Sequence, residues 1–297
     1  MTDPQQQTTN PNARLLRLAT IASVSTATLL LIAKLIAWLI TGSVSVLASL
    51  TDSLMDIAAS LINLFAVRYS LRPADEEHRF GHGKVEPLAG LAQAMFIGGS
   101  ALFLVLYAVD RIIHPKPVDE IAVGLVVMTI SMIATLALLA FQYYVIRRTQ
   151  STVIRADALH YATDVLTNFG IIVALVLTAF GMGAADAWIA ILIAIYIFYS
   201  AGKIGYDAFH LLIDRELPDD IKARILEVPE NHPGVLGYHD LRTRQSGQTA
   251  FIQLHLELDS KLTFVAAHDI ADEVEKEIQA LIPGSEVIVH HDPVVVD

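Results

Sequence analysis

Two pairs of ionisable residues stand inside long apolar stretches of this 297-residue chain. Asp52 and Asp56 form the first pair, His160 and Asp164 form the second, and the spacing within each pair is four residues. Residues four apart lie on one face of a helix, about one turn from each other. One imidazole and three carboxylates are enough ligands for a tetrahedral divalent cation. The pattern predicts an intramembrane metal site, whose ligands suit Zn²⁺ or Cd²⁺ and leave Fe²⁺ and Co²⁺ open.

Hydrogen bonding between membrane helices is the alternative interpretation of these four side chains. An ionisable group at mid-depth in a membrane costs at least about 2.5 kcal/mol, so each one needs a reason to be there. Lys34 and Lys203 are possible counter-ions, but Lys203 lies near the end of a stretch and can extend to the membrane surface. Metal binding therefore explains the two pairs better than helix association does.

Two further groups of possible ligands lie outside the apolar stretches. Asp75, His78 and His82 occur at intervals of three and four in the segment RPADEEHRFGHGK, where a solvated loop without metal is the alternative. The last 60 residues or so hold several histidines, and scattered surface histidines are the alternative there. The candidate ligands of this third site are His239, His255, His268, His290 and Asp292. His290 and Asp292 share one face of a strand, so the carboxylate could bridge two ions.

Six apolar stretches are each long enough to cross a bilayer, which requires about 20 residues. They cover residues 18–40, 43–67, 88–109, 121–146, 158–180 and 187–206. Basic residues gather in the segments on one side of these stretches, which predicts that both termini are cytoplasmic. We therefore expect a polar N-terminal tail at 1–13 and a six-helix transmembrane domain at 14–213.

Residues 214–297 have the pattern of a small soluble domain. Turn signals and apolar periodicity predict a helix at 218–227, strands at 235–244 and 249–259, a helix at 264–282 and a strand at 286–292. This order is typical of an α+β domain with one helical layer. The predicted fold class is therefore a membrane α-helical domain followed by a cytoplasmic α+β domain.

Charge and composition exclude several classes of function. Of the 31 acidic and 20 basic residues, 17 and 7 lie in 214–297, so nearly all of the net charge of −11 belongs to that domain. The chain has no basic stripe, which argues against a nucleic-acid partner. It also has no cysteine, which excludes disulfides and thiolate ligands. A cation and the lipid bilayer are the expected partners, and no organic cofactor is indicated.

Three segments of the chain resemble the cation diffusion facilitator family, most closely its bacterial ferrous-iron/zinc efflux branch. They are SLTDSLMD at 49–56, HRFGHGKVEPLA at 78–89 and DALHYATD at 157–164, and the resemblance extends over about residues 14–292.

The resemblance implies a homodimeric metal²⁺/H⁺ antiporter of the bacterial inner membrane. It implies that Asp52, Asp56, His160 and Asp164 form the transport site for Zn²⁺, and that Asp75, His78 and His82 form a loop site. It implies a metallochaperone-like (ferredoxin-like) cytoplasmic domain that binds two zinc ions and joins the protomers. It also implies a charge contact between Lys84 and Asp214 and an apolar gate at Leu159.

Two other functions remain as alternatives. A membrane-embedded metalloenzyme would need an open coordination position and a nearby general base, whereas four ligands fill the predicted site. A membrane-anchored zinc sensor without ion flux would make the intramembrane ligands unnecessary. The sequence therefore favours a secondary transporter over an enzyme or a sensor.

Overall fold

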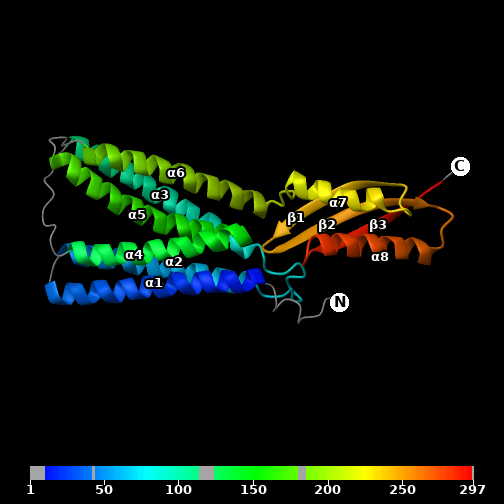
Figure 1. Ribbon diagram of the computed structural model, residues 1–297, viewed down its shortest axis with the longest axis horizontal. Helices are drawn as coiled ribbons and strands as arrows, with labels where there is room; N and C mark the ends of the chain where they lie inside the picture. The colour runs from blue at the N-terminus through cyan, green and yellow to red at the C-terminus, as the bar shows by residue number, and fades with distance from the viewer. Residues whose placement is uncertain (1–10, 42–43, 114–123, 180–184, 296–297) are drawn as a thin grey trace.

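The computed structural model is elongated, with a bundle of long helices at one end and a small mixed domain at the other (Figure 1). It describes residues 11–41, 44–113, 124–179 and 185–295. The predicted tail at 1–13 therefore lies mostly outside the described residues. The fold class predicted from the sequence is confirmed.

Each predicted apolar stretch corresponds to one helix of the bundle. The helices are α1 (Pro11–Thr41), α2 (Val44–Ser70), α3 (Val85–Ile113), α4 (Gly124–Thr149), α5 (Thr152–Ala179) and α6 (Ala185–Leu212). Most begin before or continue beyond the predicted stretch, because polar residues at the end near the small domain extend the helices. Asp157 thereby lies inside α5, one turn before His160.

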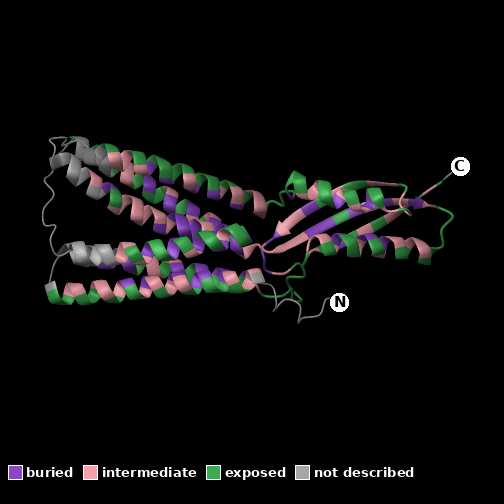
Figure 2. Ribbon diagram, in the orientation of Figure 1, coloured by how far each residue is buried: buried purple, intermediate pink, exposed green. Residues whose placement is uncertain are grey.

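The helices form two closely packed groups that share α5. α3 packs along α6, α1 packs along α2, and α5 contacts both α6 and α4. The groups diverge toward the end of the bundle that is remote from the small domain (Figure 1). Buried residues of the described part are concentrated in the half near the small domain (Figure 2). The bundle is thus most tightly packed on that side.

The outer surface of the bundle is strongly apolar. Leu29, Phe103 and Tyr199 have 67, 74 and 70% of their surface exposed. Within the described residues, three stretches are long and apolar enough to cross a membrane, at Asn12–Ile40, Val85–Leu106 and Trp188–Leu212. The other helices, α2, α4 and α5, each include residues whose side chains the structure does not describe. An exposed apolar belt of this extent is suited to a lipid environment.

The small domain has a three-stranded sheet and two helices. Its elements are α7 (Asp219–Asn231), β1 (Gly237–Ser246), β2 (Thr249–Asp259), α8 (Phe264–Leu281) and β3 (Glu286–Val294). The central strand β2 pairs with β1 in antiparallel and with β3 in parallel orientation. The strands predicted at 235–244 and 249–259 leave a turn of four residues, but the observed turn is shorter. β1 continues to Ser246, whereas β2 begins at Thr249 as predicted. Gly247, at φ +59°, takes up the left-handed conformation that the tight turn requires.

Alternation along β2 separates a covered face of the sheet from an open one. Ile252, Leu254, Leu256 and Leu258 are almost fully buried against α7 and α8, where they meet Ile225, Val274 and Ile278. The side chain of Thr263 caps α8 by accepting a hydrogen bond from the Ala266 N–H. His255 lies on the opposite face of β2, which neither helix covers. The fold therefore leaves one face of the sheet available to the histidines.

Candidate metal centres

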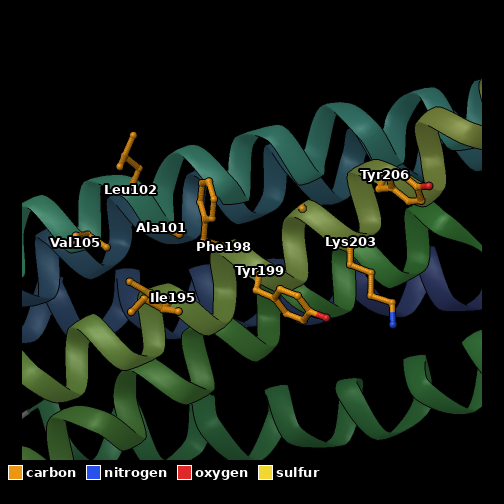
Figure 3. Close-up of a pocket in the computed structure, with 10 residues that line it drawn as sticks. Ala101, Leu102, Val105, Ile195, Phe198, Tyr199, Lys203 and Tyr206 are labelled. Atoms are coloured by element: carbon orange, nitrogen blue, oxygen red, sulfur yellow. The ribbon is translucent and has the colours of Figure 1, made fainter.

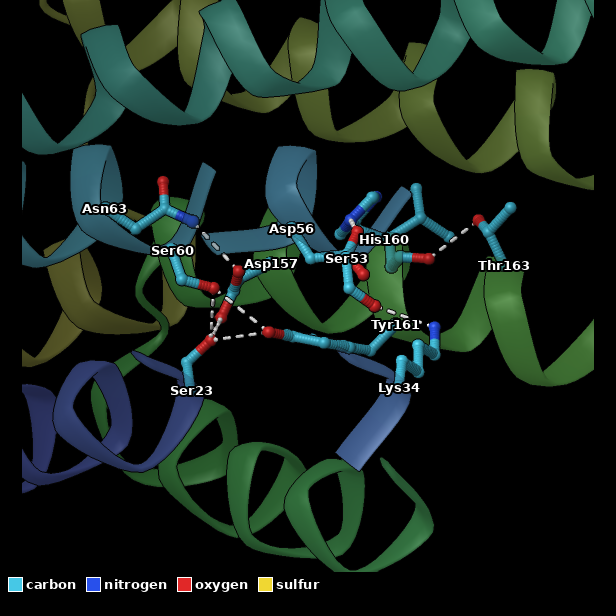
Figure 4. Close-up of polar contacts among 11 residues, drawn as sticks. Ser23, Lys34, Ser53, Asp56, Ser60, Asn63, Asp157, His160, Tyr161 and Thr163 are labelled. Atoms are coloured by element: carbon cyan, nitrogen blue, oxygen red, sulfur yellow. Dashed lines mark hydrogen bonds and ion pairs between the residues drawn. The ribbon is translucent and has the colours of Figure 1, made fainter. Parts of the chain in front are cut away.

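The first candidate site joins α2 and α5 inside the bundle. One ligand atom from each of Asp56, His160 and Asp164 lies within 4.8 Å of the others. His160 Nε2 and Asp56 Oδ1 are 2.9 Å apart, and each of these two side chains is 17% exposed. Figure 4 shows Asp56 and His160 facing each other across the two helices. Two sequence segments about 100 residues apart thus supply one nitrogen and at least two carboxylates.

Asp52 is the fourth predicted ligand of this site. Its side chain lies outside the described part of the chain, and its backbone lies one turn before Asp56 on α2. The next residue, Ser53, accepts a hydrogen bond of 2.7 Å from the Lys34 amine of α1. Lys34 therefore provides a cation close to this part of α2, as Figure 4 also shows.

A buried polar network lies one turn from this site. Asp157 is fully buried, and its Oδ2 accepts hydrogen bonds from Ser23 Oγ at 2.7 Å and Gln142 Nε2 at 2.6 Å. Its Oδ1 accepts a bond of 2.9 Å from Asn63 Nδ2. The carboxylate of α5 thereby links α1, α2 and α4. Figure 4 shows its contacts with Ser23 and Asn63. Sequence reasoning did not assign this residue a role, although polar side chains in four apolar stretches signal a shared contact.

The second candidate site lies in the loop between α2 and α3. His78 Nδ1 lies 3.2 Å from Asp75 Oδ1, and His82 Nε2 lies 3.3 Å from Asp75 Oδ2. The backbone N–H of His78 donates to Asp75 and holds the pKa of this carboxyl below its ordinary value. His82 is only 5% exposed and meets the edge of the Tyr69 ring. The loop therefore presents three ligand atoms within 4.8 Å of each other.

The third candidate site is a row of histidines across the open face of the sheet. His239 pairs with His255 in the β1–β2 register, and His255 pairs with His290 in the β2–β3 register. Asp292 Oδ2 lies 2.9 Å from His255 Nδ1 and 3.4 Å from His239 Nε2. The other oxygen, Oδ1, lies 3.3 Å from His290 Nε2. The carboxylate thus lies between His239 and His255 on one side and His290 on the other, and His239, His255 and Asp292 offer three ligand atoms within 4.8 Å of each other.

Two residues differ from the sequence-based description of this row. Glu257 Oε1 lies 3.2 Å from His239 Nδ1 and adds a carboxylate that was not among the predicted ligands. His268 is apart from the row within this chain, because it lies on α8 and stacks on Phe264 at 6.5 Å between ring centroids. The hydrogen bond from His255 lowers the pKa of Asp292, which keeps this carboxyl ionised for a cation.

Lys84 and Asp214 meet where the bundle joins the small domain. Lys84 Nζ lies 2.9 Å from Asp214 Oδ1, and Arg244 Nη1 lies 3.4 Å from the same oxygen. Partial burial opposes ionisation of Asp214, but these two cations together hold its pKa below the usual range. The Arg244 guanidinium also lies over the rings of Phe80 and Phe251, at 4.7 and 4.6 Å. One acid thus links the loop after α2 to the sheet.

Leu159, the predicted gate residue, is 7% exposed and packs with α3 and α6. Ile97, Ile197 and Ile204 belong to the same apolar cluster. Leu159 directly precedes His160 on α5. Its side chain points about 100° away from that of His160 around the helix, because adjacent helical residues differ by this angle. A role in gating remains a proposal that rests on this position beside the first site.

The tip of the β1–β2 hairpin contacts the loop between α2 and α3. A side chain at Gly83 would place its Cβ 2.4 Å from the carbonyl oxygen of Ser246. We expect Gly83→Ala to separate the hairpin from the loop, and amide exchange of residues 245–248 to rise about tenfold in hydrogen-exchange mass spectrometry. Gly99→Ala is the control, because a Cβ there meets no atom within 4 Å. Unchanged exchange in Gly83→Ala would contradict this contact.

Comparison with known proteins places both parts of the chain. The model of the cation efflux transmembrane domain matches residues 20–213, and the model of the cation efflux protein cytoplasmic domain matches residues 217–294. The cation-efflux pump FieF of Escherichia fergusonii is 53% identical over 280 residues, which cover 94% of this chain and 93% of the relative. FieF of Klebsiella pneumoniae subsp. pneumoniae is 55% identical over 280 residues, with the same coverage of 94% and 93%.

Several solved structures are similar to the small domain. The metal-bound C-terminal domain of the CzcD transporter from Thermotoga maritima is 31% identical, with a TM-score of 0.24. It covers 25% of this chain and 87% of its own length.

Proposed function

The chain belongs to the cation efflux family, and from this premise we propose that it exports Zn²⁺ from the bacterial cytoplasm in exchange for protons. The observation that carries the proposal is the convergence of Asp56, His160 and Asp164 from α2 and α5. With Asp52 as the fourth ligand, the site has one nitrogen and three carboxylates. A four-coordinate site of this composition suits Zn²⁺ or Cd²⁺ better than cations that prefer all-oxygen, higher coordination, while Fe²⁺ and Co²⁺ are also possible cargo.

Competition between protons and metal at the same atoms provides the coupling. A cation requires a neutral imidazole and ionised carboxylates, so metal binding releases protons and protonation releases metal. An imidazole ordinarily titrates near pH 6.5, between the pH of the cytoplasm and that of a more acidic exterior. Metal loaded from the cytoplasm is therefore released where protons are abundant. Rigid movement of helices around a site of this kind gives alternating access.

The test is uptake of radioactive zinc into proteoliposomes of the full chain, with and without an imposed pH gradient. Proton-coupled export predicts that uptake rises when the gradient is imposed and falls when an ionophore collapses it. Zinc uptake at the same rate with and without the pH gradient would contradict the proposed coupling. Repeating the assay with Cd²⁺, Fe²⁺ and Co²⁺ as competitors identifies which cations share the site.

The other two clusters have supporting roles in this proposal. The loop of Asp75, His78 and His82 delivers or senses metal beside the membrane, and the histidine row with Asp292 holds two cations in the cytoplasmic domain. About ten net negative charges per cytoplasmic domain repel each other across a homodimer. Bound cations would offset this repulsion and bring the two domains together.

The dimer gives a direct prediction. We expect Zn²⁺ to stabilise the wild-type dimer, and His239→Ala combined with His255→Ala to raise the dimer dissociation constant in zinc by at least about tenfold. Analytical ultracentrifugation with zinc and with chelator measures this constant. His232→Ala is the matched control, since His232 pairs with Glu273 outside the row. Equal dimer stability in the double variant and the control would refute the role of the row.

A metal sensor without flux is the second candidate function, and the exposed histidine row is the observation that favours it. A sensor would respond to zinc at the row while the proteoliposomes show no zinc uptake.

We propose the bacterial inner membrane as the location, with both termini cytoplasmic, because basic residues gather on that side of the apolar stretches.

A further inference from the structure

Buried polar atoms that lack a hydrogen-bond partner gather along one line between α3 and α5. In the helix bundle and its loops, the described residues contain six side-chain atoms of this kind. They are His82 Nδ1, Glu86 Oε2, both amide atoms of Gln93, Gln142 Oε1 and Thr152 Oγ1. Buried polar groups in proteins nearly always have a partner, so this accumulation requires an explanation.

The spacing along α3 accounts for one side of the line. Glu86, Gly90 and Gln93 lie four and three residues apart, so they share one face of the helix. Leu102 lines an apolar hollow between α3 and α6, and it points about 180° away from Gln93 around the helix (Figure 3). The polar face of α3 is therefore turned away from that hollow.

The first turns of α5 lie against this polar face. A Cβ at Gly90 would lie 3.2 Å from Thr152 Oγ1, so the two helices are close at this level. Glu86 is only 3% exposed, and its carboxyl lies beside the backbone N–H of Thr152. Gln93 lies close enough to the fully buried Asp157 to interact with its carboxyl, but the two share no direct hydrogen bond. The line thus leads into the bundle as far as Asp157.

Both ends of the line lie close to candidate metal sites. At one end, His82 precedes Glu86 by four residues, and its Nε2 lies 3.3 Å from Asp75 Oδ2 of the loop. At the other end, Asp157 lies one turn before His160 on α5. The line therefore connects the loop at the end of the bundle near the small domain with the surroundings of the proposed transport site.

Water fits these atoms better than a cation does. The line includes the amide nitrogen of Gln93, which donates, as well as the acceptor Oε2 of Glu86 and the hydroxyl of Thr152, which can do both. A water molecule also donates and accepts, and a buried water typically makes about three hydrogen bonds to polar groups that lack other partners. Chains of water and carboxyl groups can pass protons along.

We propose that α3 and α5 enclose a chain of ordered water molecules between Glu86 and Asp157, and that this chain carries protons from the transport site to the cytoplasm. The proposal rests on the proton-coupled export proposed above. A proton displaced by zinc enters the chain at the Asp157 end, and each water accepts one proton and passes one on. Glu86 accepts the proton at the other end and releases it to bulk water beside the loop. Gln93 is a positioning residue for the waters.

Water-edited solid-state NMR of the full chain in lipid bilayers tests for the waters. The glutamine side-chain amides are isotopically labelled, and Gln93→Leu identifies the Gln93 signal by its loss. We expect magnetisation to pass from water to the Gln93 amide, as it does to the exposed amide of Gln253 on β2. A Gln93 amide that receives no magnetisation from water would overturn the proposal. This measurement does not depend on zinc transport.

Zinc-driven proton movement in proteoliposomes tests the role of the chain. We expect Gln93→Leu and Glu86→Gln each to slow this movement at least about tenfold, because a positioned proton-transfer group typically contributes about 100-fold or more. The dissociation constant for zinc, measured by titration calorimetry, should stay at its wild-type value, because neither residue is a ligand. Glu86→Asp should restore most of the rate, since it keeps the carboxyl group.

Thr28→Val is the control for loss of a polar group inside the bundle, because the Thr28 hydroxyl bonds to the Val24 carbonyl of its own helix. It should keep the wild-type rate. Wild-type proton movement in both Gln93→Leu and Glu86→Gln would overturn the proton role, and so would an equal loss of zinc affinity in Glu86→Gln. Zinc uptake without proton movement in the wild type would refute the exchange itself, and the NMR signal distinguishes that failure from a dry line.

Discussion

Replacing His160 with alanine should reduce zinc uptake into proteoliposomes by more than about 100-fold, to the level of protein-free vesicles. His160 supplies the nitrogen ligand of the proposed transport site, and its Nε2 lies 2.9 Å from Asp56 Oδ1. Loss of a group that merely orients a ligand typically reduces metal affinity by about 10- to 100-fold, so loss of the ligand itself should have a larger effect. Uptake of radioactive zinc under a pH gradient gives the measurement.

His210→Ala is the matched control for this variant. His210 also lies on a helix of the bundle, but it meets Tyr206 and Phe209 on α6 and is not part of the cluster. It should retain most of the wild-type uptake. Both variants should elute as folded dimers in size-exclusion chromatography. Uptake by His160→Ala at the wild-type rate would show that the cation crosses elsewhere.

The second large effect should be a loss of stability, and it should come from Asp157 in the buried polar network rather than from a metal ligand. Asp157→Ala removes the acceptor of three hydrogen bonds from α1, α2 and α4, and it leaves these buried donors without the carboxylate. Each buried donor left unsatisfied costs about 1–3 kcal/mol, so we expect a loss of roughly 3–5 kcal/mol from the three donors together. For a chain of this size we expect the unfolding midpoint in detergent to fall by roughly 6–15 °C.

Circular dichroism on heating measures that midpoint. Ser100→Ala serves as the control, because Ser100 is an exposed residue of α3 that bonds only within its own helix turn to the Phe96 carbonyl in the described contacts. Its midpoint should change little. A midpoint of Asp157→Ala equal to that of the control would mean that the network contributes no stability.

The helices were predictable because apolar composition and length identify bilayer-spanning segments without knowledge of their neighbours. Their ends were not, because the extension of α5 back to Thr152 depends on contacts with other helices. The same extension makes Asp157 a buried residue. Its partners Ser23, Asn63 and Gln142 are far apart in sequence, so no local pattern connects them.

The histidine row shows the same limit in the small domain. Alternation along β2 predicts that His255 faces away from the apolar core, but strand register decides which residues stand beside it. Register aligns His239, His255 and His290, and it also places Glu257 next to His239. His268 was predicted within the same cluster, yet its position on α8 gives it Phe264 as a neighbour instead. Sequence alone therefore identifies the ligand types better than it identifies their partners.

The most direct test of proton-coupled zinc export follows zinc and protons together in one vesicle preparation. Radioactive zinc and a lumenal pH dye are recorded for the wild type and for Asp56→Ala under the same pH gradient. The proposed exchange predicts that zinc enters as protons leave in the wild type, and that both movements stop in Asp56→Ala. Zinc entry without proton movement, or equal fluxes in the two proteins, would contradict it.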